Sequence, residues 1–176
     1  MLSLTDIIMM TIGLTNKGWG LKDWNGEEGA YHKMQELLTN NIPADPINPL
    51  KKSALQEASY YNLPSIVRLL LEYGANVNYQ SKDTLLGSPT PLYFACQQGN
   101  LECVKILCSY SAHINVGTID NLTPFHVSIL HSHFDISTYL ITQKANVTIS
   151  NNNKCPINSL IKQCLSGYIF FTLDWA

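Results

Sequence analysis

The sequence has no long hydrophobic run and little net charge. None of its apolar segments reaches the length of about 18 residues that a transmembrane helix needs, so we expect no membrane span. Eleven Lys and Arg residues stand against 13 Asp and Glu, which gives a formal net charge of −2. The basic residues are scattered, and only Lys51 and Lys52 are adjacent. We therefore expect no bulk electrostatic attraction to nucleic acid or to an acidic membrane.

The sequence also lacks the short motifs of common catalytic sites. It has no Gly-x-Ser-x-Gly elbow, no Gly-rich phosphate-binding loop and no His-Glu-x-x-His. Glu102 and Asp120 are isolated carboxylates on different predicted elements, so they do not form a general acid–base pair. We expect a non-catalytic protein. A cysteine–histidine-dependent enzyme stays open as an alternative, because counting residues does not exclude such a pair.

The five cysteines make an odd number, and none belongs to a Cys-x-x-Cys pair. Cys96, Cys103 and Cys108 fall at helical positions that suit small apolar side chains, so we expect buried, reduced thiols. Reduced thiols suit a reducing compartment, and we predict a cytoplasmic protein with a nuclear location left open. Zinc sites usually show paired ligands in the sequence, so His131-Ser132-His133 alone predicts neither a metal nor a cofactor.

The stretch 90–115 has the signals of two short helices joined by a tight corner. Thr90 can accept a hydrogen bond at a helix start, and Pro91 suits the first helical position because it lacks an N–H. Gly99 supplies the backbone freedom that ends the first helix. The following segment, Leu101 to Cys108, is apolar around most of its circumference, which is typical of a helix packed on several sides.

That unit recurs along the chain. Thr123 opens a copy 33 residues after Thr90, and Ser53 opens one 37 residues before it. A period of about 33 residues is the signature of a repeat array. The clearest motifs are Thr90-Pro91-Leu92-Tyr93-Phe94-Ala95 and Gly74-Ala75-Asn76-Val77-Asn78. On these motifs the sequence resembles the ankyrin repeat family. We place the repeats at 53–78, 90–115 and 123–148, with a partial repeat at 155–165.

These units divide the chain into three parts. We expect an N-terminal segment over 1–50, a repeat domain over 51–165 and an apolar tail over 166–176. Residues 26–41 read as the second half of a degenerate capping repeat, because solenoids need a terminal unit with a polar outer face.

Two further segments carry functional hints. Trp19 and Trp24 either cover the exposed end of the array or form a partner-binding patch. The loop 79–89 is four residues longer than its counterpart in the next repeat. Loops vary and carry recognition, so the longer loop points to function.

The resemblance implies an all-α solenoid of helix-turn-helix units joined by hairpin loops. It also implies a non-catalytic scaffold for protein–protein interaction, with the partner bound on the concave surface. A narrower likeness is to the ankyrin and SOCS-box family, whose C-terminal box has no match here. On that likeness the chain is the substrate-recognition part of a ubiquitin ligase adaptor, and a secreted microbial effector is equally compatible. The implied partner is a protein, with no nucleic acid and no membrane.

The candidate partner-binding residues come from the variable positions of that template. We expect them to lie on the concave side of the first helix of each repeat, with two charged residues on the longer loop beside them. Exposed aromatic clusters of this kind mark partner sites, although the same side chains can instead pack on the neighbouring loop. The candidates are Glu57, Tyr60, Tyr61, Lys82, Asp83, Phe94, Gln97, Gln98, Val127, Leu130 and His131.

Overall fold

The computed structural model describes residues 26–40, 44, 52–80 and 87–147 of the 176-residue chain. Within these ranges the regular elements are all helices, and no strand is present. They are α2 (Gly26–Thr39), α3 (Ala54–Tyr60), α4 (Pro64–Glu72), α5 (Pro91–Gln98), α6 (Leu101–Ser109), α7 (Pro124–Leu130) and α8 (Phe134–Thr142). The predicted all-α repeat architecture is thereby confirmed.

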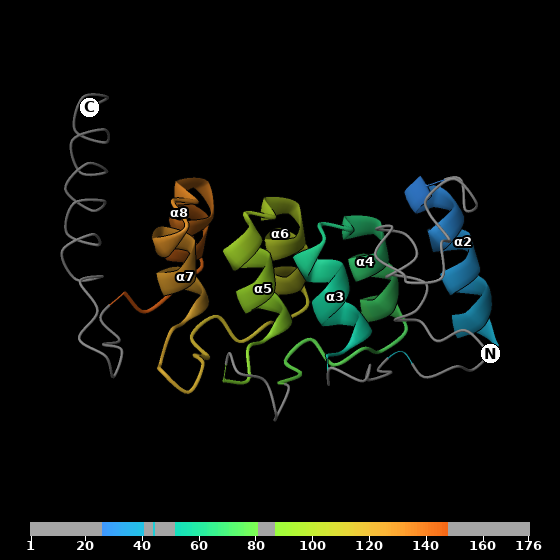
Figure 1. The fold of residues 1–176 in the computed structure, drawn as a ribbon, viewed down its shortest axis with the longest axis horizontal. Coiled ribbons are helices and arrows are strands. Elements are labelled where there is room, and N and C mark those ends of the chain that lie inside the picture. The colour runs from blue at the N-terminus through green and yellow to red at the C-terminus, as the bar shows by residue number, and fades with distance from the viewer. Residues whose placement is uncertain (1–25, 41–43, 45–51, 81–86, 148–176) are drawn as a thin grey trace.

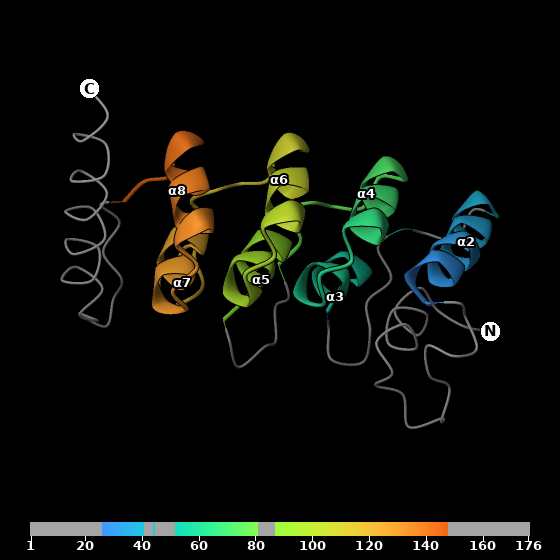
Figure 2. The same ribbon diagram turned by 90° about the horizontal axis from the view of Figure 1, so that it is seen from above.

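The helices form a row of antiparallel pairs in two layers (Figure 1). The first helix of each repeat packs on the next, α3 on α5 and α5 on α7, while α4 packs on α6 and α2 packs on α4. Figure 2 shows α3, α5 and α7 gathered more closely than α4, α6 and α8. The array therefore curves, and its concave side is the one formed by α3, α5 and α7.

Helix α2 lies in the segment that the sequence assigns to a degenerate repeat. Met34 and Leu38 are buried, while Lys33 and Glu36 form an exposed ion pair at 2.7 Å. One side of α2 is thus apolar and buried, and the other is polar and faces the solvent. No helix in the described ranges is long and apolar enough to cross a membrane.

The first helices start in the same way in all three repeats. The hydroxyls of Ser53, Thr90 and Thr123 each accept the backbone N–H three residues on, at 3.2, 3.2 and 3.4 Å. This satisfies one of the N–H groups that a helix start leaves without a partner. Pro91 and Pro124 follow directly at the first helical position, as predicted.

The core lies between the two layers and between successive repeats. Ala58, Ala95 and Ser128 occupy equivalent positions and are fully buried, so the first helices approach one another closely. Leu70, Leu107 and Leu140 occupy the matching buried position in the second helices. Because each repeat contacts only its neighbours, the array is held by a sum of neighbour interfaces.

Side-chain hydrogen bonds add to this packing at each junction. Asn100 donates from Nδ2 to the carbonyl oxygens of Ser59 at 2.8 Å and Tyr60 at 3.0 Å. One repeat later, Nε2 of His133 donates to the carbonyl oxygen of Gln97 at 3.2 Å. Each bond fixes the end of one first helix to the start of the next repeat's second helix, which holds the register between repeats.

The hairpin loops are joined in a similar way. Asn78 accepts the backbone N–H of His113 through Oδ1 at 2.7 Å, and Asn115 accepts that of Asn146 at 2.8 Å. The two bonds occupy equivalent places in successive repeats. These hydrogen bonds therefore link the loops of successive repeats to one another.

The corners and ends of the helices require left-handed backbone. Asn62, Gly99 and Ser132 turn the corner within each repeat, with φ of 56°, 79° and 62°. At the end of the second helices, Ser111 and Lys144 have φ of 63° and 65°. The sequence predicts these conformations because both residues align with Gly74, whose φ is 85°.

We predict that Ser111→Gly and Lys144→Gly each stabilise the protein. A side chain in the left-handed region costs on the order of 1 kcal/mol relative to glycine. Each substitution should therefore raise the free energy of unfolding by about that amount, measured by urea denaturation followed by circular dichroism.

The matched control is Gly74→Ser at the equivalent position. A Cβ on Gly74 would meet no atom within 4 Å, so only the backbone conformation opposes it. Gly74→Ser should lower the free energy of unfolding by a similar amount. A loss of stability in both Ser111→Gly and Lys144→Gly would contradict the assignment of these helix ends.

Candidate functional site

The first helices are buried along almost their whole length. In α3, α5 and α7 the buried residues run over 54–59, 91–96 and 124–129. The side chains that reach the surface come directly after these runs, at two consecutive positions in each repeat. We call these six residues the concave row: Tyr60, Tyr61, Gln97, Gln98, Leu130 and His131. Gln98, Leu130 and His131 are exposed, and the other three are half-buried.

Three of the predicted surface residues do not lie at the surface. Glu57, Phe94 and Val127 are 2%, 1% and 1% exposed, so the expectation that they face a partner is wrong. They occupy one equivalent position, which lies between neighbouring first helices. These three side chains are buried within the array, and their packing on the neighbouring loop stays a prediction. Lys82 and Asp83 lie outside the described residues, as do Trp19 and Trp24.

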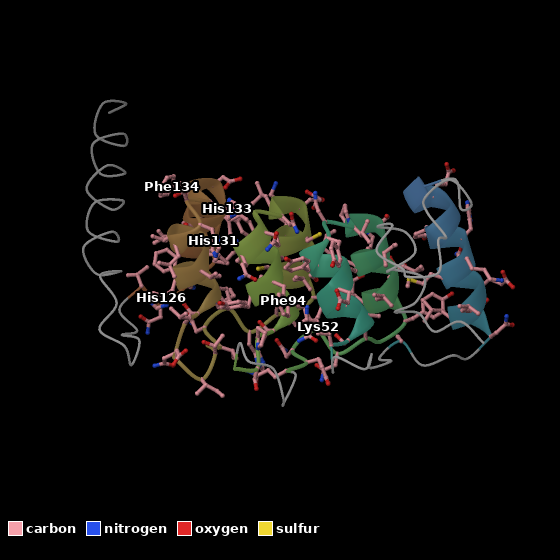
Figure 3. All side chains as sticks on the ribbon, viewed as in Figure 1. Lys52, Phe94, His126, His131, His133 and Phe134 are labelled. Atoms are coloured by element: carbon pink, nitrogen blue, oxygen red, sulfur yellow. The ribbon has the colours of Figure 1, made fainter. Side chains whose placement is uncertain are left out.

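Phe94 shows why this position is buried. Its ring meets that of Tyr60 edge to face, with 5.9 Å between the centroids. The ammonium of Lys52 lies over both rings, 5.0 Å from the centroid of Phe94 and 5.4 Å from that of Tyr60 (Figure 3). The Lys52 Nζ is also 3.8 Å from Oε1 of Glu57. Residues of the preceding repeat thus cover Phe94, and a cation over two rings stabilises that cover.

The two tyrosines at the start of the concave row are held by this cluster. The rings of Tyr60 and Tyr61 meet at 4.8 Å in an edge-to-face arrangement. Burial raises the pKa of Tyr61, and the nearby Glu57 and Tyr60 add to the shift. The phenol of Tyr61 therefore stays neutral at physiological pH and can donate as well as accept hydrogen bonds.

The other end of the row carries apolar and imidazole side chains. Leu130 is 40% exposed, and Phe134, at the start of α8, is 53% exposed. The rings of His131 and His133, both labelled in Figure 3, are nearly parallel, with their centroids 6.2 Å apart. The hydrogen bond from His133 to Gln97 fixes this ring pair against the second repeat.

His126 is buried and belongs to the helix start rather than to the surface. Its Nδ1 accepts the backbone N–H of Thr123 at 3.2 Å. Among the described residues, no three His, Cys, Asp or Glu side chains gather closely enough to hold a metal ion.

None of the three described cysteines forms a disulfide. Cys96 and Cys103 are buried, and Cys108 is half-buried. Burial raises the pKa of Cys108 to about 11, and it raises that of Cys96 well above the usual range. Because the thiolate is the nucleophile, these protonated thiols are poor candidates for covalent chemistry. Cys155 and Cys164 lie outside the described residues.

Sequence reasoning missed two exposed apolar residues, Phe134 and Ile119. Ile119 is 74% exposed in the loop before α7, where the carbonyl of Thr118 accepts the N–H of Asn121 at 2.8 Å. The Asp-Asn pair after Ile119 is a turn signal that indicates an exposed tip. Phe134 aligns with half-buried Leu101, so its exposure had no signal in the sequence.

Two models of known families match the chain. Residues 51–82 match the family described as ankyrin repeat, and residues 81–151 match the family described as ankyrin repeats (3 copies). Together the two matches span more than half of the chain. The chain belongs to the ankyrin repeat family. Ankyrin repeats are generally protein–protein interaction modules and are typically non-catalytic.

Relatives of this ankyrin repeat chain occur in several kinds of protein. It is 34% identical over 129 residues, 73% of the chain, to an ankyrin repeat protein of fowlpox virus. A second fowlpox ankyrin repeat protein is 30% identical over 68% of the chain. A tyrosine-protein kinase of Hydra vulgaris is 28% identical over 62%. The chain matches 34%, 18% and 14% of the length of these three relatives, and so spans only a part of each.

The burial pattern predicts opposite outcomes for two residues of α5. Phe94→Ala removes a fully buried ring and should lower the free energy of unfolding by about 3–5 kcal/mol. Gln98→Ala, four residues further on at the surface, should change it by less than about 0.5 kcal/mol. Urea denaturation of both variants checks this. Equal effects would mean that the surface of α5 has been misassigned.

Proposed function

We propose that this chain is a non-catalytic protein-binding module that takes its partner on the concave row. One observation carries the proposal. Each first helix begins with six buried residues, and the two residues that follow them are accessible in the same place in three successive repeats. A repeated exposed position gives a continuous surface across the array, which suits an extended partner.

The chemistry of the row supports binding. It contains two tyrosines, and tyrosine is enriched among the residues that dominate interface energies. The helix ends that carry the row are fixed by hydrogen bonds to the next repeat. Because the backbone is already ordered, little conformational entropy is lost when a partner docks.

The narrower roles have less support. The repeat region is the one feature that favours a role in substrate recognition for a ubiquitin ligase. It does not identify the partner. The raised pKa values of Cys96 and Cys108 argue against the cysteine–histidine enzyme, because the thiolate is the nucleophile. Cysteines that form no disulfide suit a reducing compartment, so we propose the cytoplasm as the site of action.

Site-specific cross-linking tests which face binds. We would place the photoreactive residue p-benzoylphenylalanine at Gln98 in the concave row, and in a second protein at Lys105 on the exposed side of α6. We expect a protein adduct from position 98 and none from position 105. An adduct from position 105 alone would place the binding face on the second helices instead.

We would combine Tyr61→Ala and Leu130→Ala, one at a time, with the cross-linker at position 98. Each substitution should reduce the adduct at least about fivefold, which is equivalent to about 1 kcal/mol of binding energy. Their melting curves should stay close to that of the parent, since both side chains are partly outside the core. The control Leu70→Ala should instead lower the free energy of unfolding by about 2–5 kcal/mol. An adduct that both surface substitutions leave unchanged would refute a role for the row.

A further inference from the structure

Charge is distributed unequally between the two layers of the array. The first helices α3, α5 and α7 contain a single charged residue, Glu57, which is buried beside Lys52. The second helices carry exposed charges of both signs. These are Arg68 and Glu72 on α4, Glu102 and Lys105 on α6, and Asp135 on α8. Ionic side chains are thus concentrated on the layer that faces away from the concave row.

The concave row itself has no carboxylate, ammonium or guanidinium group. It offers two phenols, two primary amides, an isobutyl group and an imidazole. The nearest described cation is Lys52, whose ammonium lies over Tyr60 and Phe94 and near the carboxylate of Glu57. Its charge is therefore offset within the protein rather than presented to a partner.

This surface would bind a charged partner segment poorly. A carboxylate or ammonium that docks on it loses water and gains no opposite charge, and an uncompensated charge is costly to desolvate. An amide or hydroxyl group loses little, because the Gln and Tyr side chains can both donate and accept. Aliphatic and aromatic side chains gain from contact with the tyrosine rings and with Leu130.

We propose that the concave row selects an uncharged polypeptide segment, one that combines aliphatic or aromatic side chains with amides and hydroxyls. This rests on the proposed function and adds the chemical class of the partner. It makes hydrogen bonding and apolar contact the source of specificity, with little electrostatic steering of association.

A peptide selection with defined probes tests the proposal. A phage library of random dodecapeptides is selected in parallel on the full chain and on the double variant Tyr61→Ala/Leu130→Ala. Peptides enriched only on the unaltered chain depend on the row. We expect these peptides to have a mean net charge near zero and to contain Leu, Tyr, Asn, Gln and Ser in excess over the library.

The outcomes separate the two claims. Row-dependent peptides that are rich in Asp and Glu, or in Lys and Arg, would overturn the uncharged partner and leave the row as a binding site. Peptides that bind the unaltered chain and the double variant equally would overturn the row itself, and with it both claims. A selection that enriches nothing counts against both as well.

Peptides that differ from one another by a single charge give a second measurement. A selected neutral peptide and two derivatives, with one Asp or one Lys added at the same place, are titrated against the full chain by fluorescence anisotropy. The neutral peptide should bind most tightly, and its Kd should change less than about twofold between low and high salt, because few charges are paired.

Gln98→Glu should shift the preference toward the Lys derivative, and Gln98→Lys should shift it toward the Asp derivative, with salt dependence appearing in both cases. If either charged derivative binds the unaltered chain about tenfold more tightly than the neutral peptide, the proposal is overturned.

Discussion

Each first helix is buried by the helices packed against it, and the rest of the array depends on this. A helix of seven or eight residues with a mostly apolar surface is not stable alone in water. The small side chains of Ala58, Ala95 and Ser128 let successive first helices approach closely enough to bury one another. The curvature follows from that close approach, since the second helices do not pack so tightly (Figure 2).

The same constraint limits what remains for function. When a helix uses nearly all of its circumference for packing, only its end is free to meet a partner. The concave row is therefore a by-product of the packing as much as a binding device.

Local features of the fold followed from the sequence. Thr90 and Thr123 predicted the helix starts, and Ser111 and Lys144 predicted left-handed backbone through their alignment with Gly74. These features depend on residues close together in the chain, so a single repeat contains the information.

The burial of individual positions was harder to predict. Phe94 stands at a variable position of the repeat template, and that pattern suggested exposure. Its burial depends on Lys52 and Tyr60, which come from the preceding repeat. The exposure of Phe134 is likewise a property of its surroundings. Contacts between repeats decide such cases, and a pattern read within one repeat does not include them.

The corner at Gly99 has a consequence for how this sequence can change over generations. A Cβ on Gly99 would lie 2.6 Å from Cε1 of His133, so the imidazole already occupies the space that a side chain would need. At the preceding junction the same two places are filled by Asn62 and Asn100, and Asn100 bonds to backbone carbonyls of the repeat before it. The two junctions fill the same space with different side chains. One combines a glycine with a large histidine ring, and the other combines two asparagine side chains of medium size. A side chain at position 99 therefore requires either that the His133 ring leave its hydrogen bond with Gln97 or that position 133 carry a smaller residue.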